Sequence, residues 1–102
     1  MYARIWHLQI KHGMIKEFKA ALDTVIRLAR SEEGYFGVIA LTSGRPDAPE
    51  VRIVASWDSP EAARQSEQDL FLMKAMTRYM ECCEGVPVML EKEVLASDFA
   101  AD

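Results

Sequence analysis

Residues 35–43 constrain the fold more than any other segment of this sequence. They are rich in β-branched and aromatic types and end at a turn-forming run of Gly, Pro and Asp over 44–49, which predicts a strand. Alternation along a strand places Phe36, Val38 and Ala40 on one face and Tyr35, Ile39 and Leu41 on the other. A sheet with one face in water alternates apolar and polar residues. Since this strand does not, both faces of its sheet should be covered.

Two elements precede this strand. Residues 2–10 predict a first strand, which ends in a turn at residues 11–13. After the turn, apolar residues recur at every third or fourth position, which predicts a helix of about four turns. Its buried stripe is Ile15, Phe18, Leu22, Val25 and Ala29. Gly34 stands where a left-handed residue would cap the end of this helix.

Two more elements follow the apolar strand. Residues 50–58 predict a third strand, which forms a hairpin with the second. Ser59 and Pro60 predict a helix start, because the serine hydroxyl can cap the helix and proline presets its first φ. This helix should run to about Glu84, with an irregular turn near 68–69. Its second half carries a broad apolar face: Leu72, Met73, Met76, Tyr79, Met80 and Cys83.

The helix should stop at Gly85 and Pro87, and residues 88–95 predict a fourth strand. Residues 96–102 are expected to form a flexible tail. The order β-α-β-β-α-β predicts a ferredoxin-like α+β domain over 1–102, with a four-stranded antiparallel sheet and helices on one face. A second copy of the chain, packed sheet to sheet, would cover the other face and make a homodimer.

Charge and composition limit the partners of this domain. The formal charge is −4, and the twelve basic residues are scattered between acidic neighbours, which argues against nucleic acid. No apolar run approaches the roughly 20 residues that cross a bilayer, and no secretory segment opens the chain, so we expect a cytoplasmic protein without membrane contact. The adjacent Cys82 and Cys83 fit neither a disulfide framework nor a zinc site; one should be a core thiol and the other lie at the helix edge.

Several short motifs together point to a family. Gly13 opens the first helix with Phe18 five residues later, and Glu33-Gly34 precedes the second strand. Further motifs are Ser56-Trp57-Asp58-Ser59-Pro60-Glu61-Ala62 at the strand-to-helix junction, Asp69-Leu70-Phe71, and Leu90-Glu91 in the last strand. On these motifs the chain resembles the antibiotic biosynthesis monooxygenase family of the dimeric α/β barrel superfamily. The resemblance spans nearly the whole chain and implies a homodimeric barrel.

Two branches of this superfamily place their functional residues differently. The haem-degrading branch uses an Asn, a Trp and a haem-ligating His; Trp6, Ser66 or a neighbour, and Ala75 or Met76 occupy those positions here, so we expect no haem chemistry. Cofactor-independent oxygenases that make quinones use a Trp at the end of the third strand, which Trp57 matches. The Asn four residues before it is Ile53 here, and the Tyr six residues after it is Ala63.

The resemblance implies a pocket between the sheet and the helices. Its expected lining is Arg4, Trp6, Trp57, Met73, Met76, Tyr79 and Met80, although aromatic and Met residues also serve as ordinary core. Candidates for catalysis are Trp57, Tyr79 as a phenolic proton donor, and His7. By alternation His7 lies on the other face of its strand, which by the resemblance looks away from the helices, and this favours an interface histidine. Arg4 and Arg64 could hold an anionic oxygen, and His7 and His12 lack the third ligand of a metal site.

The implied activity is a monooxygenase that acts on a small aromatic or polyketide-like molecule without metal, haem or flavin, because the substrate anion itself reduces oxygen. The alternative is a non-enzymatic homodimer that binds a small ligand or whose pocket is filled core; an isomerase is a third. A pocket of roughly 300 Å³ or more with an inward polar group would favour ligand chemistry. A dry, closed core would favour the non-enzymatic protein.

Overall fold

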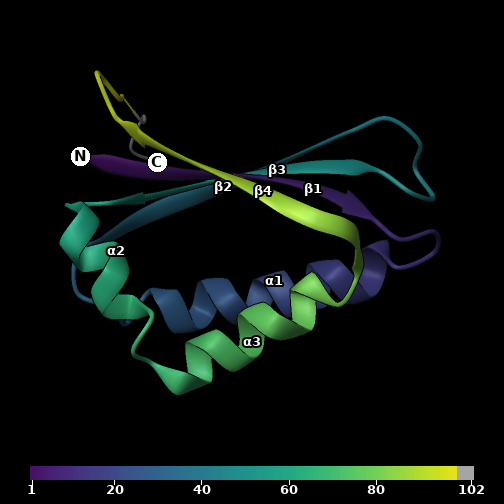
Figure 1. Cartoon of the computed structure of the whole chain (residues 1–102), viewed down its shortest axis with the longest axis horizontal. Coiled ribbons are helices and arrows are strands. Elements are labelled where there is room, and N and C mark those ends of the chain that lie inside the picture. The colour runs from purple at the N-terminus through teal and green to yellow at the C-terminus, as the bar shows by residue number, and fades with distance from the viewer. Residues whose placement is uncertain (99–102) are drawn as a thin grey trace.

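The computed structural model of this chain describes residues 1–98, which form four strands and three helices. In chain order these are β1 (Tyr2–Ile10), α1 (Ile15–Ala29), β2 (Tyr35–Ser43), β3 (Glu50–Trp57), α2 (Pro60–Ser66), α3 (Leu70–Met80) and β4 (Cys83–Glu93). The strands pair antiparallel in one open sheet, in the order β2-β3-β1-β4. All three helices lie on the same face of this sheet (Figure 1). The predicted ferredoxin-like α+β fold is therefore confirmed.

The second helical region is two helices rather than one. α2 begins as predicted, because the Ser59 hydroxyl accepts a hydrogen bond from the Ala62 amide at 3.1 Å. α3 begins after Asp69, whose Oδ1 accepts hydrogen bonds from the Phe71 and Leu72 amides at 2.9 and 3.2 Å. The predicted irregular turn is thus a complete break, because a second capped N-terminus interrupts the helix.

The end of α3 differs from the prediction. The helix ends at Met80 instead of Glu84, and β4 begins at Cys83, five residues earlier than expected. Cys83 pairs with Ile10 at the end of β1, so sheet pairing replaces the last helical turn. Both Cys82 and Cys83 are buried free thiols: Cys83 begins β4, and Cys82 follows the end of α3, where its Sγ lies 3.8 Å from the Arg78 carbonyl. Burial, together with the neighbouring Cys82, raises the pKa of the Cys83 thiol to about 11.

The glycine and proline expected to stop the helix lie inside β4 instead. Gly85 and Pro87 fall where the β1–β4 register shifts between His7 and Gln9, as a bulge does. Of the predicted flexible tail, residues 96–98 form neither helix nor strand, and residues 99–102 lie outside the described part of the chain.

β2 contains a bulge that places two aromatic side chains on the faces of the sheet opposite to those predicted. Tyr35 is opposite Trp57 and Gly37 is opposite Ser56, so Phe36 is an extra residue in the ladder. Tyr35 consequently shares the helix-covered face with Trp57, and Phe36 lies on the open face. Strict alternation had placed them the other way round, and this part of the prediction is wrong.

The open face of the sheet is apolar. Its outer strands carry large side chains that are between 42% and 55% exposed: Phe36, Ile39 and Leu41 from β2, and Val88 and Leu90 from β4. β2 is therefore apolar on both faces, as predicted. None of the helices in residues 1–98 covers this face (Figure 1).

Gly34 holds the turn between α1 and β2 against α2. Its φ of +81° is left-handed, but α1 already ends at Ala29, so Gly34 is not the cap of that helix. A Cβ atom at this position would lie 2.5 Å from the Cβ of Ala62, and the Asp58 amide donates a hydrogen bond to the Gly34 carbonyl at 2.7 Å. Only glycine fits both the backbone angle and the close approach.

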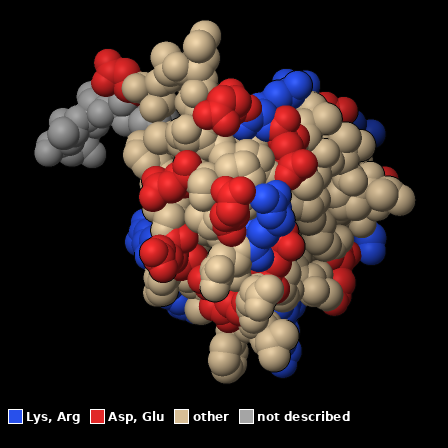
Figure 2. Space-filling model, turned by 60° about the vertical axis from the view of Figure 1, so that its left-hand side comes forward, with Lys and Arg blue, Asp and Glu red and all other residues tan. Residues whose placement is uncertain are grey.

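The surface shows mixed charge. On the face drawn in Figure 2, Lys and Arg side chains lie among Asp and Glu and form no basic patch. No helix in residues 1–98 has the length and apolar character needed to cross a membrane.

Candidate functional site

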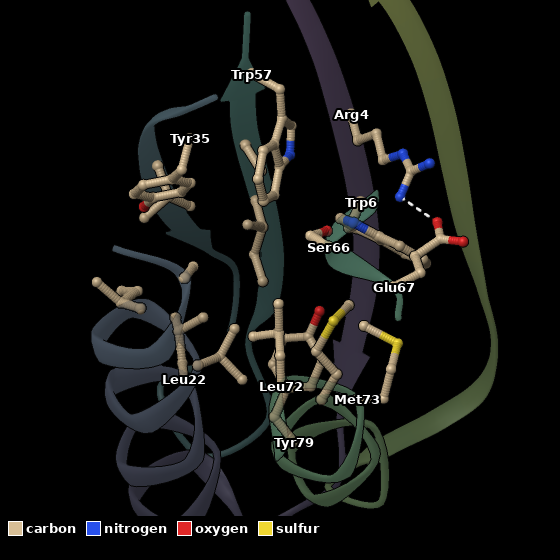
Figure 3. A pocket seen from close by; sticks show the side chains of 17 residues that line it. Arg4, Trp6, Leu22, Tyr35, Trp57, Ser66, Glu67, Leu72, Met73 and Tyr79 are labelled. Carbon is tan, nitrogen blue, oxygen red and sulfur yellow. Dashed lines mark hydrogen bonds and ion pairs between the residues drawn. The ribbon is translucent and has the colours of Figure 1, made fainter. Parts of the chain in front are cut away.

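A cavity of about 220 Å³ lies between the sheet and the helices. Six residues predicted to line a pocket surround it: Arg4, Trp6, Trp57, Met73, Met76 and Tyr79. Met80 does not line it and packs on the neighbouring core instead. Residues that were not predicted as pocket lining complete the wall, among them Tyr35, Ser66, Glu67 and Leu72 (Figure 3). The cavity is smaller than the roughly 300 Å³ expected of a ligand pocket, yet the core is not closed.

Trp57 and Tyr35 form an aromatic corner of the cavity. Their ring centroids are 5.3 Å apart in an edge-to-face arrangement, at an interplanar angle of 72°. Trp57 also packs on Tyr2 and Ala63 beneath α2 and is only 6% exposed. The bulge turns Tyr35 to this side, and the glycine after Phe36 was its sequence signal, since glycine within a strand often marks a bulge.

Tyr79 comes from α3 and stands with Leu72 at the end of the cavity opposite the two Trp rings (Figure 3). Its ring stacks on Phe18 with centroids 5.6 Å apart, and the residue is 2% exposed. Its hydroxyl has no hydrogen-bond partner within residues 1–98. Burial raises the pKa of Tyr79 far above its usual value, and the neighbouring Cys83 adds to the shift. At neutral pH Tyr79 can therefore donate a hydrogen bond but cannot act as a base.

Arg4 stands to one side of the cavity in a network of hydrogen bonds. Its Nη1 donates to Glu67 Oε1 at 2.6 Å, and its Nε donates to the Tyr2 hydroxyl at 2.9 Å (Figure 3). The Tyr2 hydroxyl in turn donates to Glu91. Burial alone would lower the pKa of Arg4, but the hydrogen bonds that Arg4 donates to Tyr2 and Glu67 outweigh it and raise the pKa. The guanidinium, 12% exposed, stays charged.

Glu67 marks the mouth of the cavity. Its side chain is 49% exposed and lies in the break between α2 and α3, so the cavity meets solvent there. Among the described lining residues Glu67 is the one carboxylate, and it is already paired with Arg4. Sequence reasoning missed Glu67, because it expected an irregular turn at 68–69 but gave no sign that this turn would bring Glu67 to the cavity.

The other candidates lie away from the cavity. His7 is on the open sheet face, in a shallow groove with Arg52 and Glu84, as alternation predicted. Arg64 is exposed on α2, where it pairs with Glu61 at 3.3 Å. His12 pairs with Asp47 at 3.0 Å in the turns at the far end of the sheet. Across residues 1–98 no group of three His, Cys, Asp or Glu side chains is arranged to hold a metal ion.

The cavity offers hydrogen-bond donors within an apolar, aromatic wall. The Trp6 and Trp57 indole N–H groups and the Tyr79 hydroxyl have no acceptor within residues 1–98, and Ser66 donates to the Ala63 carbonyl at 2.6 Å. Ile53 lines the cavity where the oxygenase branch has its Asn, and Ala63, fully buried, stands at the position of its Tyr. Such a site suits a flat ring that carries oxygen acceptors.

Comparison with known proteins agrees with this fold. The sequence profile of the antibiotic biosynthesis monooxygenase family matches residues 1–70. A candidate antibiotic biosynthesis monooxygenase from Nitrosomonas europaea has a TM-score of 0.81 at 14% identity, over 94% of this chain and 100% of the other. A similar candidate from Chloroflexus aurantiacus has a TM-score of 0.78 at 20% identity, over 96% of each chain.

SnoaB, a cofactor-independent oxygenase from Streptomyces nogalater, also shares the fold. Its TM-score is 0.78 at 12% identity, over 94% of this chain and 95% of SnoaB. No curated protein matches the sequence. At identities this low, the structural likeness shows the shared fold and does not by itself assign an activity.

Proposed function

Since this chain belongs to the antibiotic biosynthesis monooxygenase family, we propose that it is a monooxygenase that oxidises a small phenolic ring to a quinone without metal, haem or flavin. The observation that carries the proposal is the cavity, in which Trp57 and Trp6 wall an apolar space and the free polar groups are donors. SnoaB, which shares the fold, is a cofactor-independent oxygenase.

In this reaction the substrate supplies all the electrons. A phenol with a free para carbon and one O₂ give a quinone and one water: one oxygen atom joins the ring carbon, and the other leaves as water with the two hydrogens. The phenolate is the electron-rich form that reduces O₂, and negative charge passes to oxygen as the reaction proceeds. A protein then needs to fix the ring, exclude water and stabilise that charge.

The described residues fit these tasks. Trp6 and Trp57 hold a flat ring, and Leu72 with Met76 shields it from water. Tyr79, kept protonated by burial, donates a hydrogen bond to an oxygen on which negative charge develops. Among the described residues that line the cavity there is no free base, so the substrate must enter as its anion or lose its proton at the mouth.

Oxygen uptake tests this proposal. With 1-naphthol as substrate and metal chelator present, we expect one O₂ consumed per quinone formed, no released peroxide, and a rate well above that of the phenol alone. Uptake that stops with the chelator, or release of hydrogen peroxide in place of water, would contradict a cofactor-independent monooxygenase.

A second candidate is a non-enzymatic homodimer that binds a small ligand. Ile53 and Ala63 favour it, because they supply no amide or hydroxyl where the oxygenase branch has them. Ligand binding in the cavity without any oxygen uptake across a set of phenols would support this candidate. We also propose that the protein is cytoplasmic and forms a homodimer through its open sheet face. The exposed apolar side chains of β2 and β4 support the homodimer.

A further inference from the structure

We propose that the natural ligand of this cavity is a one- or two-ring aromatic carboxylate whose anionic end replaces Glu67 on Arg4. This inference rests on the proposed use of the cavity as the substrate site and adds the size and charge of the substrate. It makes Arg4 a specificity-determining residue and Glu67 an internal competitor of the ligand.

The volume of the cavity limits the number of rings. A dry apolar protein cavity of roughly 150 Å³ holds one benzene molecule. The cavity of about 220 Å³ therefore has room for a substituted single ring or two fused rings. A substrate of three or four fused rings would have to displace the wall of Leu72 and Trp57, both of which are nearly fully buried.

The polarity of the wall selects oxygen-bearing rings. Trp57 and Tyr79 are nearly buried as whole residues, and their N–H and O–H groups donate to no acceptor within residues 1–98. No fully buried side-chain nitrogen or oxygen in these residues lacks a partner, so both donor groups reach the surface of the cavity. A hydrocarbon in the cavity would cover these donors without accepting their hydrogen bonds, which is costly, so a ligand that accepts them is favoured. Both donors line the cavity from opposite ends, Tyr79 beside Leu72 and Trp57 nearer to Arg4 (Figure 3).

Arg4 supplies a fixed positive charge at the same cavity. The hydrogen bond from Nε to Tyr2 holds the guanidinium plane in place, and Tyr2 is itself tied to Glu91 on β4. Arg4 pairs with Glu67 through Nη1, as the dashed line in Figure 3 shows, and both residues line the cavity. A guanidinium presents paired N–H donors that match the two oxygens of a carboxylate.

Glu67 is the partner that can leave. It lies in the short break between α2 and α3 and is half exposed, so its side chain can turn into water without unwinding a helix. A ligand carboxylate that takes its place exchanges one negative charge for another, which leaves the charge of the site unchanged. The ligand ring then fills the apolar cavity, which Glu67 does not.

The test is a binding comparison on the full chain with 2-naphthoate and its neutral analogue 2-naphthamide, followed by Trp fluorescence. We expect the wild-type protein to bind the carboxylate roughly tenfold tighter than the amide, the scale of one charge-assisted hydrogen bond. Arg4→Gln should abolish that preference while leaving amide binding within about twofold. Glu67→Gln should tighten carboxylate binding several-fold, since the competitor is gone, and leave amide binding unchanged.

Arg64→Gln is the matched control, because Arg64 is an exposed arginine outside the cavity, and it should change neither affinity. If Arg4→Gln does not fold, Glu67→Gln and Arg4→Lys carry the test. Equal affinity for the two ligands in wild type, or a preference that survives Arg4→Gln, would overturn the inference.

Oxygen uptake separates this inference from the proposed function. If the protein oxidises 1-naphthol but shows no carboxylate preference, the proposed monooxygenase activity is supported and the proposed role of Arg4 is contradicted. If carboxylate binding depends on Arg4 but no oxygen is consumed with 5-hydroxy-2-naphthoate as substrate, the role of Arg4 is supported and the proposed monooxygenase activity is contradicted.

Discussion

Trp57 joins packing and the candidate site in a single side chain. It ends β3, contacts Tyr35 edge to face, and packs on Tyr2 and Ala63, while another part of the same ring lines the cavity. A large aromatic residue in such a position can be core, cavity wall or both, and burial alone does not separate these roles. A conservative substitution does, because stability and ligand binding then respond independently.

For Trp57→Phe we expect a loss of about 1 kcal/mol in the free energy of unfolding, because most of the apolar volume is kept. Ligand binding and oxygen uptake should fall clearly, since the indole N–H and part of the flat wall are lost. Urea unfolding and ligand titration of the same preparation measure the two effects. Unchanged binding per folded molecule would show that Trp57 is ordinary core.

Individual residues also show where sequence patterns stop being informative. Arg4, Trp6, Trp57 and Tyr79 line the cavity. Strand alternation put Arg4 and Trp6 on one face, and the family resemblance supplied the pocket toward which that face looks. Tyr35 was misplaced because one inserted residue reverses the alternation of everything before it in the strand. Met80 was included only by helical spacing, and it lies on the core side of the cavity.

At the scale of elements, local sequence predicted a helix or strand correctly where its residues favour one structure, and failed where they suit a helix and a strand equally. The Ser59 cap and the antiparallel hairpin followed from strong local chemistry. The end of α3 did not, because the apolar pair Cys82-Cys83 suits a helix face and a strand end equally well. Pairing with Ile10 decides between them, and that contact joins residues far apart in the sequence.

The contact between the α1–β2 turn and α2 gives a prediction at this scale. Gly34→Ala should lower the free energy of unfolding by roughly 2–4 kcal/mol, because it combines a left-handed φ with a clash against Ala62. Gly44→Ala is the control: Gly44 has a φ of +87° but no atom within 4 Å of the added Cβ, so only the backbone cost of roughly 1 kcal/mol remains. Equal losses in urea unfolding would mean that the close approach contributes nothing.

At the scale of the whole molecule, the helices protect one face of the sheet and leave an apolar face open. Apolar patches of this kind on a small domain commonly mark a protein interface. The sequence predicted this asymmetry from β2 alone, since no polar alternation appears there. The pattern of β2 predicts that the open face is covered but does not identify the chain that covers it, and the homodimer remains our proposal.

Ile39→Lys tests the proposed homodimer. Ile39 is 45% exposed in the single chain, so a lysine there should lower the free energy of unfolding of the subunit only slightly. A two-fold interface would bury the lysines of both subunits, which carry like charges. We expect sedimentation to show a dimer for the wild type and a folded monomer for the variant at micromolar concentration. Leu70→Lys, at an exposed position on α3, should leave the dimer intact. A wild-type monomer, or a dimer that tolerates Ile39→Lys, would contradict this interface.

The cavity and the open face lie on opposite sides of the same sheet. In a sheet-to-sheet dimer the two cavities would therefore face outward, with both sheets between them and no residue shared. Each subunit would saturate on its own, with a Hill coefficient near one, and inactivating one subunit would leave the other at full speed. The dimer would then contribute solubility and a stable fold, and regulation of turnover would have to act at the mouth of each cavity.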